Sequence, residues 1–266
     1  MIRMTNREFD VLNHNEQAWD VQALSQNEWS KPVTAEFIAQ VKRGDWNIHL
    51  TPTPLNKEWL GDVSGKRILC LASAGGQQGP TLAALGAEVT VYDLSREQLN
   101  QDDFVAQRDG LKLNTVQGDM TDLSCFENET FDLVFHPISN HYIADVTLVW
   151  KEAYRVLKSG GLLLSSFFNP VVFIADHSPQ DMKEGIIRPR FTLPYADVKD
   201  LTDKELQQKI DDKQALVFGH TLQDLLGGQL DAGFLISHYT EDMQPHPRFV
   251  IDKYLSTFMA TRAVKM

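Results

Sequence analysis

The sequence predicts an α/β fold in which helices cover both faces of a doubly wound, parallel sheet. Apolar runs alternate with helical stripes from residue 66 to 168, and one run breaks into a glycine-rich turn at Ala74-Gly-Gly-Gln-Gln-Gly79. A second apolar run ends in a carboxylate at Asp93. Strands that alternate with helices require parallel neighbours. Such sheets bind their ligands at the carboxyl ends of the strands, so we expect a ligand site there.

The first strand leads into the candidate ligand loop. The apolar run 68–71 reaches Gly75 and Gly76, and Pro80 then opens a helix. Glycine is needed where a ligand lies against the backbone or where φ is positive. The free N–H groups at a helix N-terminus can bind polar groups of a nucleotide-like ligand. The same loop also matches a dinucleotide fingerprint whose first glycine is replaced by alanine.

The second and third strands each end in an acidic residue. Run 88–93 places Asp93 where a carboxylate can accept hydrogen bonds from both hydroxyls of a ribose. NAD and S-adenosylmethionine both contain such a ribose. Run 113–117 continues into Gly118-Asp-Met120, which suits the amino edge and the face of an adenine. This third element favours S-adenosylmethionine.

Two more strands complete the predicted parallel core. Residues 131–137 form the fourth strand, and the helix that begins after Asp145 ends at Lys158-Ser-Gly-Gly161. Residues 162–168 form the fifth strand. After the second strand, residues 95–98 match a capping box, which predicts that a helix begins directly behind the ribose carboxylate.

The remainder of the chain lacks this alternation. Residues 1–60, with four tryptophans, predict a helical cap or lid, although the tryptophans would equally serve to attach an extra helix to the core. Residues 61–266 are expected to form the main domain, with an insertion at about 171–218 that has no βα period. Residues 221–233 restore a helix, and residues 234–239 and 256–262 restore two strands.

Four blocks in order resemble the class I S-adenosylmethionine-dependent methyltransferases, of the methyltransferase domain 11 type and its small-molecule group. They are the glycine loop at 72–79, residues 91–95, residues 118–120, and residues 131–137 followed by 152–162. The resemblance covers about residues 64 to 168. It implies a Rossmann-like seven-stranded sheet of order 3-2-1-4-5-7-6 with strand 7 antiparallel, where a nicotinamide domain usually closes with a parallel strand.

The resemblance also implies the cofactor, S-adenosyl-L-methionine, which becomes S-adenosyl-L-homocysteine when its methyl group is transferred. In that family the glycine loop contacts the methionine part, and acidic residues corresponding to Asp93 and Asp119 contact ribose and adenine. The expected cofactor-binding residues are Ala72, Ala74, Gly75, Gly76, Gln77, Gln78, Asp93, Leu94, Gln98, Gly118, Asp119, Met120 and His136.

One position departs from the family pattern. Cys70 stands on the first strand where the family usually has Asp or Glu, a residue that helps to hold the methionine amino group. Gln77 and Gln78 are candidates to compensate for it.

Candidate catalytic residues follow the fourth strand. His136, Asn140 and His141 can orient or deprotonate a substrate. Methyl transfer from a sulfonium has an activated leaving group, so positioning and desolvation can supply much of the rate without a fixed triad. The alternative is that these residues cap a loop or line the pocket without reacting. The other histidines show no ligand spacing and predict no metal, and Asp102-Asp103 is expected to be a solvated helix face.

The composition of the chain disfavours some classes of binding partner. A formal charge of −11 on 266 residues disfavours a nucleic-acid backbone or an anionic membrane surface. Cys70 and Cys125 give no disulfide framework, and we expect a cytoplasmic protein with no signal peptide and no membrane helix. We expect a monomer or homodimer that methylates a small molecule. An NAD(P)-dependent oxidoreductase and a non-catalytic adenosylmethionine-binding protein remain alternatives.

Overall fold

The main sheet has seven strands in the order β3-β2-β1-β4-β5-β9-β8. The computed structural model describes residues 9–25 and 28–266. The strands are β1 (Arg67–Leu71), β2 (Glu88–Asp93), β3 (Leu113–Gln117), β4 (Phe131–His136), β5 (Leu157–Phe168), β8 (Phe234–Asp242) and β9 (Phe258–Lys265). β1 to β5 pair in parallel, whereas β9 pairs antiparallel with both β5 and β8. The predicted order 3-2-1-4-5-7-6 is confirmed, because β8 and β9 are the sixth and seventh strands of this sheet along the chain.

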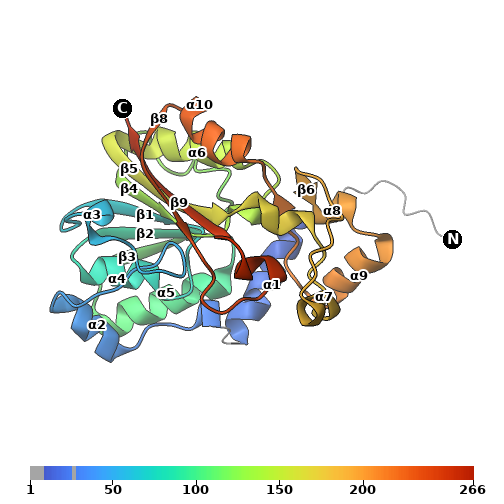
Figure 1. Ribbon diagram of the computed structural model, residues 1–266. Helices are drawn as coiled ribbons and strands as arrows, with labels where there is room; N and C mark the ends of the chain where they lie inside the picture. Colours follow the sequence, from blue (N-terminus) through green and yellow to red (C-terminus); the bar gives the residue numbers. More distant parts are fainter. Residues whose placement is uncertain (1–8, 26–27) are drawn as a thin grey trace.

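Helices cover both faces of the sheet (Figure 1). α4 and α5 pack against β2 and β3, while α6 packs against β5, and α10 contacts both α6 and β8. These helices are α4 (Gln78–Ala84), α5 (Arg96–Asp109), α6 (Val146–Val156) and α10 (Gly228–Asp231). The doubly wound architecture is therefore confirmed.

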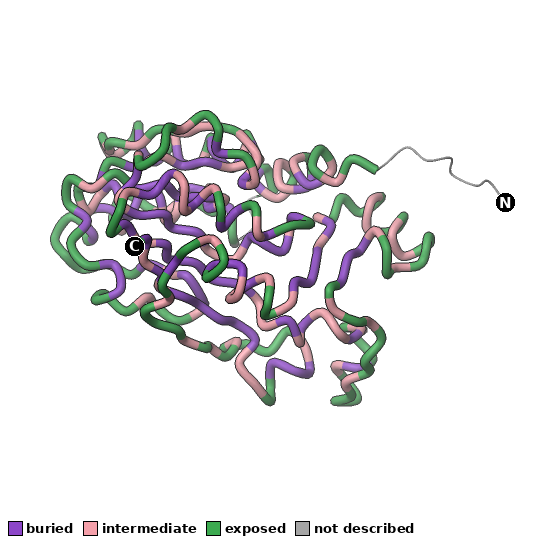
Figure 2. The backbone as a smooth tube through the Cα atoms, turned by 90° about the horizontal axis from the view of Figure 1, so that it is seen from above, coloured by how far each residue is buried: buried purple, intermediate pink, exposed green. Residues whose placement is uncertain are grey.

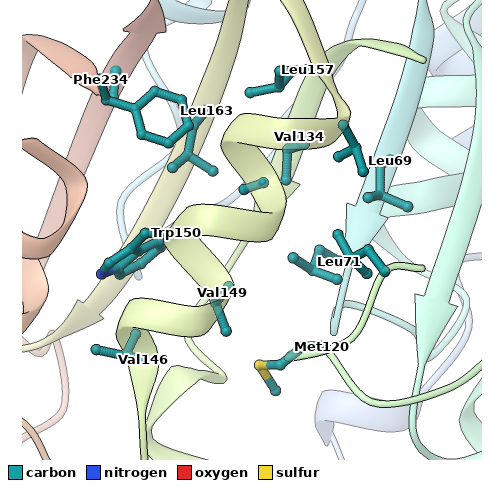
Figure 3. Packing of buried hydrophobic residues seen from close by; sticks show 14 of the residues in the cluster. Leu69, Leu71, Met120, Val134, Val146, Val149, Trp150, Leu157, Leu163 and Phe234 are labelled. Atoms are coloured by element: carbon teal, nitrogen blue, oxygen red, sulfur yellow. The ribbon is translucent and has the colours of Figure 1, made fainter. Parts of the chain in front are cut away.

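Side-chain alternation along the strands divides the core between the two faces. On β1, Leu69 and Leu71 join the cluster beneath α6, where Trp150 is fully buried. Ile68 and Cys70 point to the opposite cluster, beneath α4 and α5. Figure 3 shows the first cluster, in which Met120 lies beside Leu71 near the strand ends. The buried strands form the centre of the molecule in Figure 2, as a period of two predicts for a sheet covered on both sides.

The start of α5 uses half of the predicted capping box. Ser95 Oγ accepts the N–H of Gln98 at 3.1 Å. The side chain of Gln98 does not return to the cap, because its amide donates to Ser30 Oγ at 2.6 Å. The N–H of Ser95 donates instead to Asp93 Oδ1 at 3.0 Å. The carboxylate of Asp93 at the end of β2 therefore accepts the N–H of Ser95, which the side chain of Gln98 would accept in a complete capping box.

The passage from α6 to β5 differs from the expected helix end at residues 158–161. α6 ends at Val156, β5 begins at Leu157, and Phe131 pairs with Leu157 while Leu133 pairs with Leu162. The intervening residues therefore bulge from the ladder. Lys158 stabilises the bulge through an ion pair with Asp132 at 2.7 Å.

The first 60 residues contribute three short α-helices and one 3₁₀ turn among the described residues. These elements are α1 (Val11–Leu24), η1 (Glu28–Ser30), α2 (Ala35–Lys42) and α3 (Lys57–Leu60). α1 packs against α5, and α2 packs against α4 and α5. The N-terminal helices therefore add a layer outside the helices that cover β2 and β3.

The expected insertion folds into short elements beyond the carboxyl ends of the parallel strands (Figure 1). They are η3 (Pro170–Ile174), α7 (Pro179–Glu184), β6 (Tyr195–Ala196), α8 (Asp197–Asp200), α9 (Asp203–Asp211) and β7 (Phe218–Gly219). β6 and β7 pair as a separate two-stranded antiparallel sheet. The helix expected at 221–233 is a π-helical turn, η4 (Gln223–Gly227), followed by α10. None of the helices in residues 9–25 and 28–266 is long and apolar enough to cross a membrane.

Candidate functional site

A cavity of about 740 Å³ lies at the carboxyl ends of the parallel strands. Its walls come from the loops after β1 to β5, from α1 and the segment 49–52, and from residues 244–258. Ligand pockets of small-molecule enzymes are usually of this size. The lining includes Trp19, Trp29, Ala74, Asp93, Asp119, Met120, His141, Tyr142, Phe168, Arg248 and Phe258.

The glycine loop is held tightly between α5 and the segment 29–33. Gly75 and Gly76 have φ values of +118° and +74°, a region that favours glycine. A Cβ atom on Gly76 would lie 2.9 Å from the carbonyl oxygen of Gln101 and 2.9 Å from Pro32 Cβ. The carbonyl of Gly76 also accepts the N–H of Val33 at 2.9 Å. The loop conformation therefore depends on neighbours as well as on glycine.

Two carboxylates hold the backbone of this loop. Ala74 N–H donates to Asp93 Oδ2 at 3.1 Å, and the N–H groups of Gly75 and Gly76 donate to Asp102 Oδ2 at 2.8 and 3.0 Å. The prediction that Asp102 lies on a solvated helix face is wrong, because this side chain is fully buried. The period of α5 turns Asp102 inward, whereas Asp103 remains partly exposed.

Asp93 has the environment expected of a ribose-binding carboxylate. Burial raises the pKa of Asp93 to about 6, although the backbone N–H groups of Ser95, Ala74 and Leu94 act in the opposite direction. Oδ2 accepts the N–H of Ala74 at 3.1 Å, and Oδ1 accepts the N–H of Ser95 at 3.0 Å. A carboxylate oxygen has a further lone pair, so capacity remains for hydroxyl groups on the cavity side. The residues present therefore fit the ribose of the cofactor.

Gly118 brings the ends of β2 and β3 together. A Cβ atom at this position would lie 2.0 Å from the hydroxyl oxygen of Tyr92, and the N–H of Gly118 donates to the carbonyl of Asp93 at 2.9 Å. Asp119 and Met120 follow directly and line the cavity. Oδ1 and Oδ2 of Asp119 accept the N–H and hydroxyl of Thr121, which fixes the orientation of this carboxylate. Both acidic residues thus lie at one edge of the sheet.

The predicted cofactor residues divide into two groups in the structure. Those on the cavity wall are Ala72, Ala74, Gln77, Gln78, Asp93, Leu94, Gln98, Asp119 and Met120. Gly75, Gly76, Gly118 and His136 lie outside the lining. Gln77 and Gln78 brace the N-terminal segment, since Gln77 Nε2 donates to the carbonyl of Lys31 and Gln78 Oε1 accepts the N–H of His49.

Two of the three candidate catalytic side chains are buried in the framework. His136 Nδ1 donates to the carbonyl of Leu71 at 2.9 Å, and burial lowers the pKa of this imidazole to about 4. Asn140 Nδ2 donates to the carbonyl of Ser166 at 3.0 Å. Both side chains therefore connect the end of β4 to a neighbouring strand, and neither lines the cavity.

His141 is the candidate that reaches the cavity. It is 7% exposed, and its Nδ1 has no hydrogen-bond partner in the described part of the chain. Burial lowers its pKa to about 3, and the positive charges of His220, Arg248 and Lys209 act in the same direction. The ring centroid lies 3.9 Å from that of Tyr142. His141 is therefore a neutral imidazole on the cavity wall, and its Nδ1 is buried without a hydrogen-bond partner in the described residues.

Arg248 is the residue of the cavity wall that the sequence analysis missed. Its guanidinium carbon lies 5.6 Å from the ring centroid of Phe168 and 5.7 Å from that of Phe258. Within the described residues it is the only Lys or Arg of the lining, and no carboxylate lies within ion-pair distance of it. No local motif marks Arg248, because the link between β8 and β9 reaches the cavity only through the fold.

The tryptophans of the N-terminal region separate into two roles. Trp59 is buried in the core beneath α4 and α5, as expected of a residue that attaches a helix. Trp19 and Trp29 instead line the cavity. Trp19 packs edge-on against Tyr142 with ring centroids 5.3 Å apart.

Two features distinguish this protein from nicotinamide-binding domains. β9 pairs antiparallel with β5, and acidic residues stand at the end of β2 and shortly after β3. The chain belongs to the class I S-adenosylmethionine-dependent methyltransferases. The sequence profile of the methyltransferase domain family matches residues 69–165.

Similarity to known proteins extends over nearly the whole chain. The chain is 47% identical over 257 residues to the "Uncharacterized methyltransferase YbaJ" of Bacillus subtilis, and the match covers 96% of this chain and 99% of that protein. It is 33% identical over 113 residues to the ubiquinone biosynthesis O-methyltransferase of Xanthomonas oryzae pv. oryzae, covering 41% and 45% of the two chains. The crystal structure of an S-adenosylmethionine-dependent methyltransferase from Mesorhizobium loti has a TM-score of 0.62 at 18% identity, covering 78% and 94%. The protein is therefore a methyltransferase that uses S-adenosylmethionine.

Proposed function

We propose that the protein transfers the methyl group of S-adenosylmethionine to a small-molecule acceptor. The observation that carries this proposal is the extent of the cavity beyond the predicted cofactor residues. Among the lining residues that were not predicted to bind the cofactor are five side chains that contact one another in turn, which we call the acceptor end: His141, Tyr142, Phe168, Arg248 and Phe258. Pockets for small molecules are concave and mostly apolar, with a few polar groups that fix orientation.

The acceptor end favours a planar or apolar molecule that carries negative charge. Phe168 and Phe258 offer aromatic surface, with ring centroids 5.1 Å apart. Arg248 lies over both rings, and no carboxylate of residues 9–25 and 28–266 forms an ion pair with it. A guanidinium attracts carboxylates, phosphates and deprotonated hydroxyl groups.

The residues of the acceptor end orient the acceptor rather than supply a strong base. The cofactor, when bound, supplies an activated methyl group. His141 remains neutral near pH 7 because its pKa is lowered to about 3. Its ring lies on the cavity wall, so this imidazole can position the acceptor but is too weak a base to take a proton from it. Holding the two reactants in line and excluding water then supplies much of the acceleration.

Contacts of α1 support the proposal that the described part of residues 1–60 forms a cap over this site. Asn15 on α1 donates from Nδ2 to the carbonyl of Leu216 at 3.0 Å and accepts the N–H of Leu216 at 2.8 Å. The same Nδ2 donates to the carbonyl of Tyr142 at 3.2 Å. One buried amide therefore joins the N-terminal region, the insertion at about 171–218 and the loop after β4. This arrangement supports a cap and an insertion that together cover a small acceptor.

We extend the proposal to the partners, the cellular location and the oligomeric state of the enzyme. The formal charge of −11 disfavours nucleic-acid and anionic-membrane partners. The free thiols of Cys70 and Cys125 suit a reducing compartment, so we place the protein in the cytoplasm as a monomer or homodimer. The relative from Xanthomonas, whose name refers to O-methylation in ubiquinone biosynthesis, supports a small acceptor.

An acceptor screen tests this proposal. Purified protein is incubated with S-adenosylmethionine and pools of phenols, carboxylic acids, amines and heterocycles, and with total RNA and a protein extract in separate reactions. S-adenosylhomocysteine production and label transfer are measured. We expect transfer to an anionic planar molecule and none to RNA or protein. Transfer to RNA or protein in the absence of any small acceptor contradicts the proposal.

A further inference from the structure

The N–H groups of Gly75 and Gly76 point toward α5. Gly75 and Gly76 do not line the cavity, and their positive φ values direct both N–H groups to Oδ2 of Asp102. Asp102 is fully buried and likewise does not line the cavity. This carboxylate therefore acts on the shape of the loop and has no direct contact with the ligand site.

The space around Asp102 is made by a third glycine. A Cβ atom on Gly79 would lie 3.1 Å from Asp102 Oδ1 and 2.7 Å from Val91 Cγ2. Oδ1 is buried without a hydrogen-bond partner in the described residues. Burying a carboxylate is unfavourable unless its hydrogen bonds compensate. In the described residues, the Asp102 carboxyl group accepts hydrogen bonds only from Gly75 and Gly76. These two hydrogen bonds offset the unfavourable burial of Asp102, and they form only in this conformation of the loop.

Cys70 completes the arrangement. It lies on β1 directly before the loop, where the family pattern has an acidic residue, and its thiol is fully buried beneath α4 and α5. Cys70 pairs in register with Val91 on β2, and a Cβ atom on Gly79 would touch both Val91 and Asp102, so the two side chains belong to the same buried region. Burial raises the pKa of the thiol, and the charge of Asp102 raises it further. A second carboxylate at position 70 would therefore share this buried region with Asp102.

We propose that Asp102 is the positioning residue of the cofactor loop and supplies from α5 the carboxylate that β1 lacks at Cys70. The inference depends on the cofactor class and not on the acceptor. It predicts that the oxygen that accepts the two loop N–H groups can be supplied from either position, but that neither two carboxylates nor the loss of every acceptor is tolerated well.

Calorimetric titration with S-adenosylhomocysteine tests this inference on four variants. Asp102→Ala is expected to weaken binding about tenfold or more, because the two hydrogen bonds that hold the loop backbone are lost. Asp102→Asn keeps an oxygen that accepts both N–H groups and is expected to stay within about threefold of the wild type. Cys70→Asp alone should weaken binding, whereas the double variant Cys70→Asp/Asp102→Ala should recover most of the affinity lost in Asp102→Ala.

Two comparisons separate positioning from general damage. Asp103→Ala, on the same helix and paired with Arg96 instead of the loop, should bind like the wild type. Hydrogen exchange of the apo wild-type protein should show slow exchange at the amides of Gly75 and Gly76. Because hydrogen exchange uses the wild-type protein, it still tests whether Asp102 holds the loop if Asp102→Ala does not fold.

Three results overturn the inference: wild-type affinity in folded Asp102→Ala, a double variant no better than Asp102→Ala, or fast exchange at the two glycine amides. Failure of the wild type itself to bind S-adenosylhomocysteine would instead refute the cofactor class.

Discussion

Asp93 accepts the N–H of Ala74 across the gap between β2 and the loop after β1, with 3.1 Å between nitrogen and Oδ2. The carboxylate of β2 and the glycine loop of β1 are therefore one hydrogen-bonded unit. A cofactor that contacts either part is influenced by both.

Replacement of Asp93 by alanine is expected to weaken S-adenosylhomocysteine binding by about 1–3 kcal/mol, because two charge-assisted hydrogen bonds to ribose are lost. Calorimetric titration measures the change. Asp132→Asn is the matched control, since this carboxylate pairs with Lys158 away from the cavity lining. Unchanged affinity in Asp93→Ala would refute its assignment to ribose.

Binding of S-adenosylhomocysteine is expected to depend on pH through Asp93. The ionised carboxylate is the better acceptor for ribose hydroxyls, and burial raises its pKa to about 6. Affinity should therefore be constant near pH 8 and fall as the pH drops below about 6. Titrations from pH 5 to 8 on the wild type and Asp93→Asn test this, and equal pH dependence in the two proteins would contradict the assignment.

Asp102 gives the apo protein a stability that falls as the pH rises. Burial raises the pKa of Asp102 to about 8, against hydrogen bonds from Gly76 and Gly75, so the folded state binds more protons than the unfolded state above pH 4. The free energy of unfolding contributed by this group is therefore greatest in acid and is lost as the pH rises from about 4 to about 8.

Urea denaturation of the wild type and Asp102→Asn across that range measures the effect. The amide does not titrate, so the difference between the two proteins should change with pH in that direction. A difference that stays constant would mean that Asp102 is ionised throughout.

Arg248 is expected to control acceptor binding without affecting the cofactor. Arg248→Gln should raise the KM for an anionic acceptor found by the screen about tenfold, because a charge-assisted contact is lost, and should leave S-adenosylhomocysteine affinity unchanged. Arg248→Lys should recover part of the loss. Lys253→Gln, an exposed charge in the same link between β8 and β9, serves as the control. If Arg248→Gln weakened S-adenosylhomocysteine binding as much as it raised the KM for the acceptor, Arg248 would contact the cofactor, and its assignment to the acceptor would be wrong.

The parallel strands could be predicted closely because their signals are local. The runs 88–93 and 113–117 coincide with β2 and β3, since each run of strand-forming residues lies between a preceding glycine and the turn or helix that follows it. The bulge at 158–161 was read as a helix end because Gly160 and Gly161 are typical of both.

The roles of Asp102 and Arg248 depend on contacts between distant segments. Asp102 reaches Gly75 across 27 positions of the chain, and adjacent aspartates on a helix give no sign of which one is buried. Arg248 meets Phe168 only after β9 inserts beside β5. Local pattern cannot reveal either, whereas Asp93 and Asp119 could be proposed from the sequence, because Asp93 ends β2 and Asp119 lies two residues after the end of β3.

The most direct test of this account is calorimetric titration of the ligand-free wild-type protein with S-adenosylhomocysteine and, separately, with NADH. The cavity, the paired acidic residues and the glycine loop predict binding of S-adenosylhomocysteine in the micromolar range and none of NADH. Binding of NADH, or of neither compound, would contradict the assignment of this cavity to S-adenosylmethionine.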